Sequence, residues 1–199
     1  MNEPQLKELI LQSLEHEMGG VTVYENAVEC AINDDLREEW EEYLDQTRTH
    51  VQILREICET FQIDPDEDTV GRSVVRTVGT ALVDAMKLAS ERGNREAAQL
   101  VACEAVVLAE TKDHLDWELL GKCAKKLKGE AANALQQACE QVEDEEDEHL
   151  YHTKGWCREL WVQSLGMRAV LPPPEEVHHV KTAIGASRAE QSSEKSRRR

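Results

Sequence analysis

Apolar and small residues recur every three or four positions along most of the chain, and this period predicts α-helices. Over residues 4–32 the stripe comprises Leu6, Leu9, Ser13, Val21, Tyr24 and Val28. Residues with this spacing fall on one face of a helix. The same pattern predicts a second helix ending near residue 62, a shorter helix over residues 70–91, and two long helices over residues 95–127 and 130–165.

Short polar or glycine-containing segments separate the predicted helices. They are Asn33-Asp34, residues 64–68, Gly93-Asn94 and Lys128-Gly129. Such residues are typical of helix caps and turns. The connection between the second and third long helices is long and holds its own short helix, as in a four-helix bundle with one crossover. The pattern therefore predicts an all-α fold in which the first and third long helices are antiparallel.

The chain also repeats itself once. The matching spacings are Glu17, Tyr24 and Cys30 against Glu110, Trp117 and Cys123, and His50 and Cys58 against His149 and Cys157. The first set is shifted by 93 positions and the second by 99. Each half would form one helical hairpin, so the repeat predicts two hairpins related by a pseudo-twofold axis.

Charge and composition exclude some classes of partner. The 199 residues include 40 acidic and 23 basic ones, which gives a net charge of −17. Such a chain would repel nucleic acid, whose binding depends on neutralising phosphates, and anionic membranes. No apolar run approaches the roughly 20 residues of a membrane-spanning helix. The start of the chain does not resemble a signal peptide, and the six cysteines lack metal-finger spacing, so we expect a cytoplasmic protein.

The pattern divides the chain into a helical domain over residues 1–165 and a C-terminal tail over residues 166–199. The tail contains Pro172-Pro173-Pro174 and ends in a segment rich in Ser, Glu and Arg. This composition predicts an extended and then disordered segment.

Five carboxylate or imidazole side chains fall on the inward faces of the predicted helices: Glu17, His50, Glu110, Glu146 and His149. The hairpin geometry places Glu17 level with His50, and Glu110 level with His149, because the midpoint of each pair lies at its interhelical break. Converging carboxylates and imidazoles are costly to bury unless a cation holds them. The sequence therefore predicts a metal site, with the neighbouring His16, His114 and His152 as weaker alternative ligands.

The motif Glu146-Asp147-Glu148-His149, together with Glu17 and Glu110, resembles the ferritin-like superfamily, which includes rubrerythrins, ferritins and manganese catalases. Members use a Glu from the first and third helices and a Glu-x-x-His from the second and fourth to hold two metal ions. The resemblance covers about residues 4–165. It implies a ferritin-like four-helix bundle, often dimeric, that binds iron or manganese and acts on oxygen or peroxide by oxidising Fe(II) or removing peroxide.

The second helix departs from that pattern, because Thr47 stands where the family has a bridging Glu. Asp113, one turn beyond Glu110, could supply a replacement oxygen, so one or two ions are expected. Carboxylate and imidazole donors suit iron or manganese, and zinc stays open.

An alternative function needs no metal. Glu17–His50 and Glu110–His149 could form buried ion pairs in a degenerate ferritin-like scaffold that binds another protein. Enzymatic activity is accordingly left open by the sequence.

Overall fold

The computed structural model describes residues 1–197, and this part of the chain is all-α, with no strand. The seven helices are α1 (Glu3–Cys30), α2 (Asp34–Thr60), α3 (Val70–Arg92), α4 (Arg95–Ala124), α5 (Glu130–Ser164), α6 (Pro174–Val177) and α7 (Ala183–Arg197). The predicted all-α fold is confirmed, and the helices of the first 165 residues begin and end within a few residues of their predicted limits.

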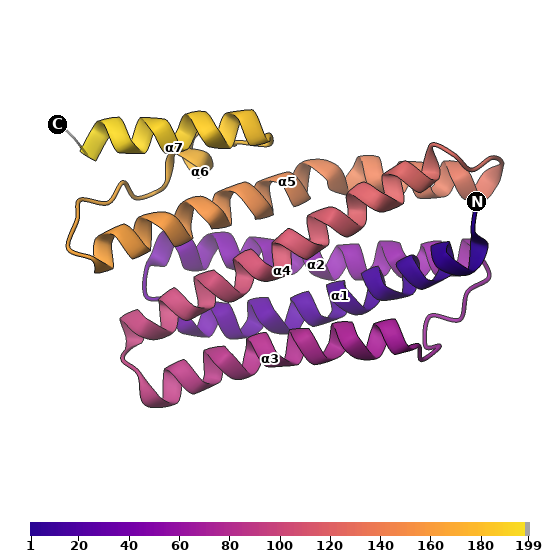
Figure 1. Ribbon diagram of the computed structural model, residues 1–199, viewed down its shortest axis with the longest axis horizontal. Coiled ribbons are helices and arrows are strands. Elements are labelled where there is room, and N and C mark those ends of the chain that lie inside the picture. Colours follow the sequence, from indigo (N-terminus) through magenta and orange to yellow (C-terminus); the bar gives the residue numbers. More distant parts are fainter. Residues whose placement is uncertain (198–199) are drawn as a thin grey trace.

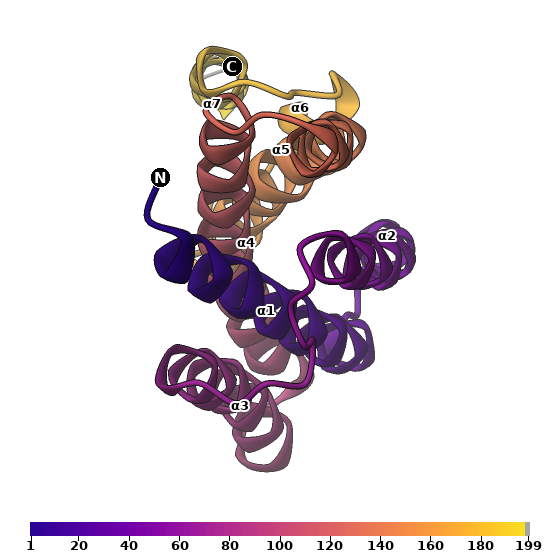
Figure 2. The same ribbon diagram turned by 90° about the vertical axis from the view of Figure 1, so that its right-hand side faces the viewer.

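The long helices α1, α2, α4 and α5 pack side by side, and α3 covers the outer side of α1 and α4 (Figures 1 and 2). Helix α1 packs against α2 and α4, and α5 packs against α4 and α2. The course of the chain in Figure 1 shows that α1 and α4 run in opposite directions, as the crossover predicts. The connection that makes them antiparallel contains α3.

Side-chain caps set the starts of four helices. Asn2, Asn33, Thr69 and Asn94 each accept a hydrogen bond from the backbone N–H three residues later. Such caps satisfy N–H groups that have no partner inside the helix. Before α5, Gly129 has a φ of 87°, a left-handed conformation that suits glycine.

The core consists of two apolar clusters with a polar layer between them. One includes Tyr24, Trp40 and Trp156, and the other includes Ile10 and Leu120. Along α1, the second cluster ends at Leu14 and the first begins at Val23. A layer of buried polar side chains thus lies between the clusters, near the middle of the long helices.

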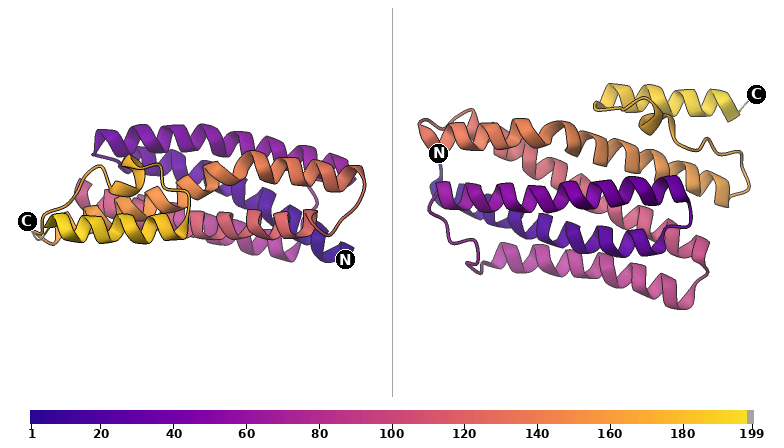
Figure 3. Two further views of the ribbon diagram at one scale, coloured as in Figure 1. Left: turned by 90° about the horizontal axis from the view of Figure 1, so that it is seen from above. Right: turned by 180° about the vertical axis from the view of Figure 1, so that it is seen from behind.

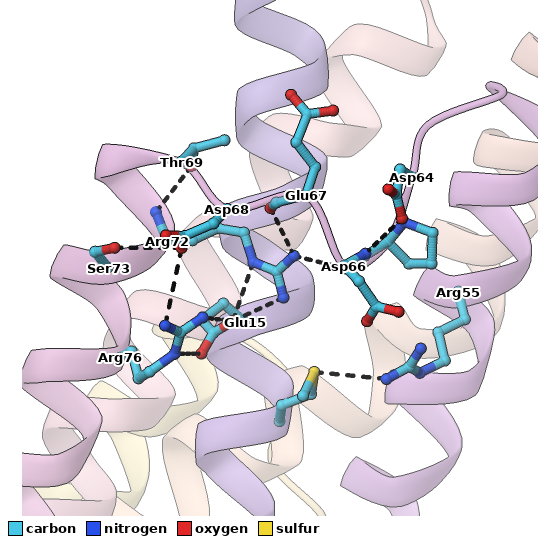
Figure 4. A network of polar contacts seen from close by, with 12 residues as sticks. Glu15, Arg55, Asp64, Asp66, Glu67, Asp68, Thr69, Arg72, Ser73 and Arg76 are labelled. Carbon is cyan, nitrogen blue, oxygen red and sulfur yellow. Dashed lines mark hydrogen bonds and ion pairs between the residues drawn. The ribbon is translucent and has the colours of Figure 1, made fainter.

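Helix α3 is attached to α1 by a buried ion pair (Figure 4). The Arg72 side chain is 4% exposed and donates to Glu15 Oε2 at 2.7 Å, and it also donates to two backbone carbonyls of the preceding loop. Arg76 donates to Glu15 Oε1 at 2.6 Å from a more exposed position. Two arginines therefore neutralise one buried carboxylate.

The C-terminal segment differs from its prediction. An extended, disordered tail is wrong for Ala183–Arg197, which forms α7 alongside the C-terminal half of α5 (Figure 3). The predicted tail's last two residues, 198–199, lie outside the described residues. Glu159 of α5 is fully buried and accepts hydrogen bonds from Arg197, Arg158 and the Val170 N–H. These long-range contacts explain why α7 packs against α5, although its own composition does not predict a helix.

We predict that Arg72→Met lowers the free energy of unfolding by about 3 kcal/mol, because it leaves a buried carboxylate with one partially exposed partner. Arg76→Met is the matched control, since the Arg76 side chain is 54% exposed, and it should cost about 1 kcal/mol or less. Urea unfolding followed by circular dichroism measures both. Equal losses in the two variants would contradict the role assigned to Arg72.

The ion pairs of Glu159 predict a pH dependence. Burial raises the pKa of its carboxyl, but hydrogen bonds from Arg197, Val170 N–H and Arg158 outweigh burial and leave the pKa below its ordinary value of 4.5. The contribution of Glu159 is therefore complete above pH 4.5 and is lost as the pH falls through the lowered pKa. We expect the melting temperatures of the wild type and Glu159→Gln to differ most near neutral pH and to converge in acid. A difference that grows on acidification would argue against this pairing.

Candidate metal centre

The five predicted site residues all lie in the polar layer and come together there. Glu17 and His50 are fully buried. The other three, Glu110, Glu146 and His149, are at most 3% exposed. They project from α1, α2, α4 and α5, so each of the four long helices contributes at least one side chain. Position on the inward stripe, which the sequence predicts, accounts for this convergence.

The donor atoms form two groups of three that share one residue. In the first, His50 Nδ1 lies 3.0 Å from Glu146 Oε1 and 3.5 Å from Glu17 Oε1. In the second, His149 Nδ1 lies 3.5 Å from Glu110 Oε2 and 3.8 Å from Glu146 Oε1. Within each group, one atom per residue lies within 4.8 Å of the others. Glu146 belongs to both groups, which gives it the position of a bridge.

Two polar side chains outside this set orient the imidazoles. His50 Nε2 lies 2.8 Å from Glu145 Oε2, and His149 Nε2 lies 2.7 Å from Gln46 Oε1. Because both partners are acceptors, each Nε2 donates and each Nδ1 faces the centre. Sequence reasoning missed Glu145 and Gln46. Each stands four residues before the histidine of its own helix, and that repeated spacing was the available signal.

Tyr24 and Trp117, seven residues after Glu17 and Glu110, each face the carboxylate of the other half. Trp117 Nε1 donates to Glu17 Oε1 at 2.7 Å. Tyr24 is buried near Glu110, and burial followed by the charge of Glu110 raises the pKa of its phenol. These aromatic side chains thus contact the central carboxylates as well as packing in the core.

The alternative histidines are engaged elsewhere. His16 Nε2 lies 2.9 Å from the carbonyl oxygen of Ala109, and His114 Nε2 lies 2.9 Å from Asp147 Oδ1. His152 Nδ1 lies 3.1 Å from Glu39 Oε1. None of the three belongs to the two groups of donors in the described part of the chain.

Thr47 stands at the position that corresponds to Glu146 in the internal repeat, and its surroundings fit its small side chain. Its Oγ1 donates to the Tyr43 carbonyl of its own helix at 2.8 Å. A Cβ on Gly20 would approach the Thr47 methyl group to 3.3 Å, so Gly20 and Thr47 fill this corner together. In the other half, a shift of 93 places Asp113 at the position equivalent to Gly20.

Asp113 brings a further carboxylate to the centre. It is 4% exposed. Burial and the charges of Glu146, Glu17 and Glu110 raise the pKa of Asp113 well above its ordinary value. The half that contains Glu146 is therefore richer in oxygen donors than the half that contains Thr47.

Most of the side-chain atoms that could bind a metal at the centre lack hydrogen-bond partners. The buried atoms without one include Glu17 Oε2, His50 Nδ1, Glu110 Oε2, Asp113 Oδ1 and both oxygens of Glu146. Buried polar atoms in folded proteins are nearly always paired. Carboxylate oxygens, and imidazole nitrogens once they are deprotonated, are ligands that suit a divalent iron or manganese ion.

The charges at the centre depend on one another. Burial lowers the pKa of His50, but interactions with Glu146 and Glu17 outweigh this and raise it to about 11. Burial is also the main reason that the pKa of Glu146 rises to about 7. The imidazoles are the positive partners here, because no lysine or arginine pairs with the central carboxylates in the described residues.

A cavity of about 300 Å³ between α4 and α5 reaches the centre from the surface. Glu146 and Trp117 line it together with His114, Asp147 and Gly121. It offers small molecules a route to the shared carboxylate.

Comparison with known proteins does not assign the chain: no protein-family model, curated protein or solved structure matches it. Within residues 1–197, none of the helices has the combination of length and apolar character needed to cross a membrane.

We predict that Asp113→Asn stabilises the protein at neutral pH in the presence of a chelator by about 1 kcal/mol or more, because folding no longer has to bury a carboxyl of raised pKa among three other carboxylates. Thermal unfolding with excess chelator measures the effect. Asp116→Asn on the same helix is the control, since Asp116 already pairs with Lys112 and should lose stability instead. A destabilising Asp113→Asn would show that this carboxylate has a favourable partner.

Proposed function

We propose that this chain is a ferritin-like protein that binds iron or manganese between its four long helices. The main support is the pair of donor groups, Glu17–His50–Glu146 and Glu110–His149–Glu146, which share one carboxylate and have unpaired donor atoms. The order and directions of the helices agree with the family pattern. Zinc would accept the same donors, so the choice among these metals is left to experiment.

The number of buried carboxylates is enough to balance two divalent ions. Glu17, Glu110, Asp113 and Glu146 are all buried. With neutral imidazoles, the four carboxylates carry four negative charges, which two divalent cations balance. A single divalent ion leaves two buried negative charges, which is costly unless protons neutralise them.

The chain's own residues fit an oxidation or peroxide-removing function. Gln46 and Glu145 fix the imidazoles with Nδ1 toward the centre, and Glu146 is placed between the two donor groups. A bound iron or manganese ion would supply the redox chemistry. The cavity that ends at Glu146 and Trp117 admits molecules of the size of oxygen or peroxide.

A metal-free scaffold is the second candidate. It is favoured by the separation of 3.0 Å between His50 Nδ1 and Glu146 Oε1 and by the raised pKa of His50, which together allow an ion pair without a cofactor. In that case the acidic surface would bind another protein.

The test is the metal content of untagged protein after anaerobic loading with Fe(II) and Mn(II) in competition, measured by mass spectrometry. We expect about two ions per chain, with the content reduced to about one or less in Glu110→Ala and in His149→Ala. Metal should raise the melting temperature of the wild type but not of these variants.

Glu104→Ala is the matched control, because Glu104 is exposed on α4 and accepts a hydrogen bond from Trp161 at 3.0 Å, away from the centre. It should keep the wild-type metal content. Folded wild-type protein that holds no iron or manganese, and whose stability does not respond to either metal, would contradict the proposal and support the scaffold. Peroxide and oxygen consumption by the loaded protein then tests the chemistry.

A further inference from the structure

A second pocket, of about 390 Å³, lies outside the centre and is lined by side chains from α2 and α5 and from the C-terminal segment that includes α6. Its lining contains six carboxylates and two imidazoles and no lysine or arginine. These residues are Asp35, Glu38, Glu39, Glu42, Glu148, Glu176, His152 and His179. The family resemblance stops before the segment that supplies Glu176 and His179.

Glu39 is the fixed carboxylate of this pocket. Its Oε1 accepts from Tyr43 OH at 2.5 Å and lies 3.1 Å from His152 Nδ1. Its Oε2 accepts from Trp156 Nε1. Three neighbours thus hold the carboxylate in place, and because Nδ1 of His152 faces Glu39, its Nε2 points elsewhere.

Two atoms of the pocket residues are buried and lack hydrogen-bond partners. His152 is 3% exposed, and its Nε2 has none. The same holds for Oε2 of Glu176. Burial, followed by the charge of Glu39 and a hydrogen bond with it, raises the pKa of Glu176 to about 8. Two buried atoms without partners, in a pocket lined by six carboxylates and by no lysine or arginine, indicate that the pocket is short of positive charge.

The neighbouring lysine and arginine side chains do not neutralise all the carboxylates of the pocket. Lys181 lies 3.3 Å from Glu148 and 3.0 Å from Asp144, at the edge of the pocket. Arg158 is occupied by Glu175 and Glu159. Glu148 is therefore partly neutralised from outside, whereas Glu39 and Glu176 have no lysine or arginine partner in the described structure.

We propose that this pocket binds a divalent transition-metal ion, with His152 and Glu176 as its buried donors. Imidazole and carboxylate together suit such an ion better than an organic cation. In the described residues, the pocket donors do not form a group as close as the two in the centre. Binding therefore requires small side-chain movements, and we expect an ion that is held more weakly and exchanges more readily.

The pocket and the centre are adjacent but share no donor. The Tyr43 ring packs on the His149 ring with centroids 4.1 Å apart, and its hydroxyl contacts Glu39 and His152. Tyr43 thus separates the two sites. The pocket does not depend on the proposed function of the centre, and each can be tested in the absence of the other.

The experiment is a Mn(II) titration of the chelator-treated, full-length protein, in which free Mn(II) is counted by its six-line electron paramagnetic resonance signal. We expect a weaker class of one site per chain beside any tight sites. Glu176→Gln should raise the dissociation constant of the weaker class by at least about tenfold. Its amide resembles the neutral carboxyl and can still donate to Glu39, so the fold should persist. His152→Gln is a second variant with the same expectation.

Glu41→Gln is the control, because it makes the same Glu-to-Gln change at an exposed position of α2 that does not line the pocket. It should leave the weaker class unchanged. An equal loss of affinity in this control would show that the acidic surface attracts Mn(II) non-specifically, and it would overturn the proposal. Unchanged Mn(II) binding in both pocket variants would also overturn it. Glu110→Ala should lose the tight Mn(II) sites and keep the weaker one. Loss of both classes would show that the pocket is not a separate site. If the wild type has the weaker class alone, the result contradicts the proposed function of the centre and supports metal binding in the pocket.

Discussion

The stability of this helical bundle depends on how its buried carboxylates are neutralised, because each charge loses its hydration on folding. On the outside of the bundle the solution is arginine. Glu15 pairs with Arg72 and Arg76, and this pairing attaches α3 to α1. Glu159 uses Arg158 and Arg197 in the same way, and this pairing attaches α7 to α5. Peripheral helices are thus held to the bundle through neutralised acids.

The centre of the bundle is treated differently. Glu17, Glu110 and Glu146 are as buried as Glu15, yet among the described residues their positive partners are imidazoles. An imidazole can give up its proton and become a metal ligand, whereas an arginine cannot. Elsewhere the chain pairs buried acids with arginine, whereas here it leaves several carboxylate oxygens unpaired, and this contrast supports the proposal that the centre binds a cation.

The sequence could predict the helices and the burial of the central residues because both depend on periodicity, which is local. It could not predict the hydrogen bonds of Gln46 and Glu145, since each joins helices far apart in the chain. Helix α7 was missed for the same reason. Its composition is polar, and its position depends on contacts such as that between Arg197 and Glu159. The ligand roles of the central residues, and the kinship that the motif suggests, stay predictions.

The two halves of the centre contribute unequal numbers of carboxylates. A Cβ on Gly20 would approach the Thr47 methyl group to 3.3 Å, so these two residues already pack closely together. Gly20 and Thr47 form a closed corner, while their counterparts Asp113 and Glu146 both bring carboxylates to the centre. The total number of carboxylates thus matches a symmetric site, but their distribution favours the side that the cavity between α4 and α5 reaches. If two ions bind, the one nearer Glu110 and Asp113 should therefore be held by more oxygen donors than the one nearer His50.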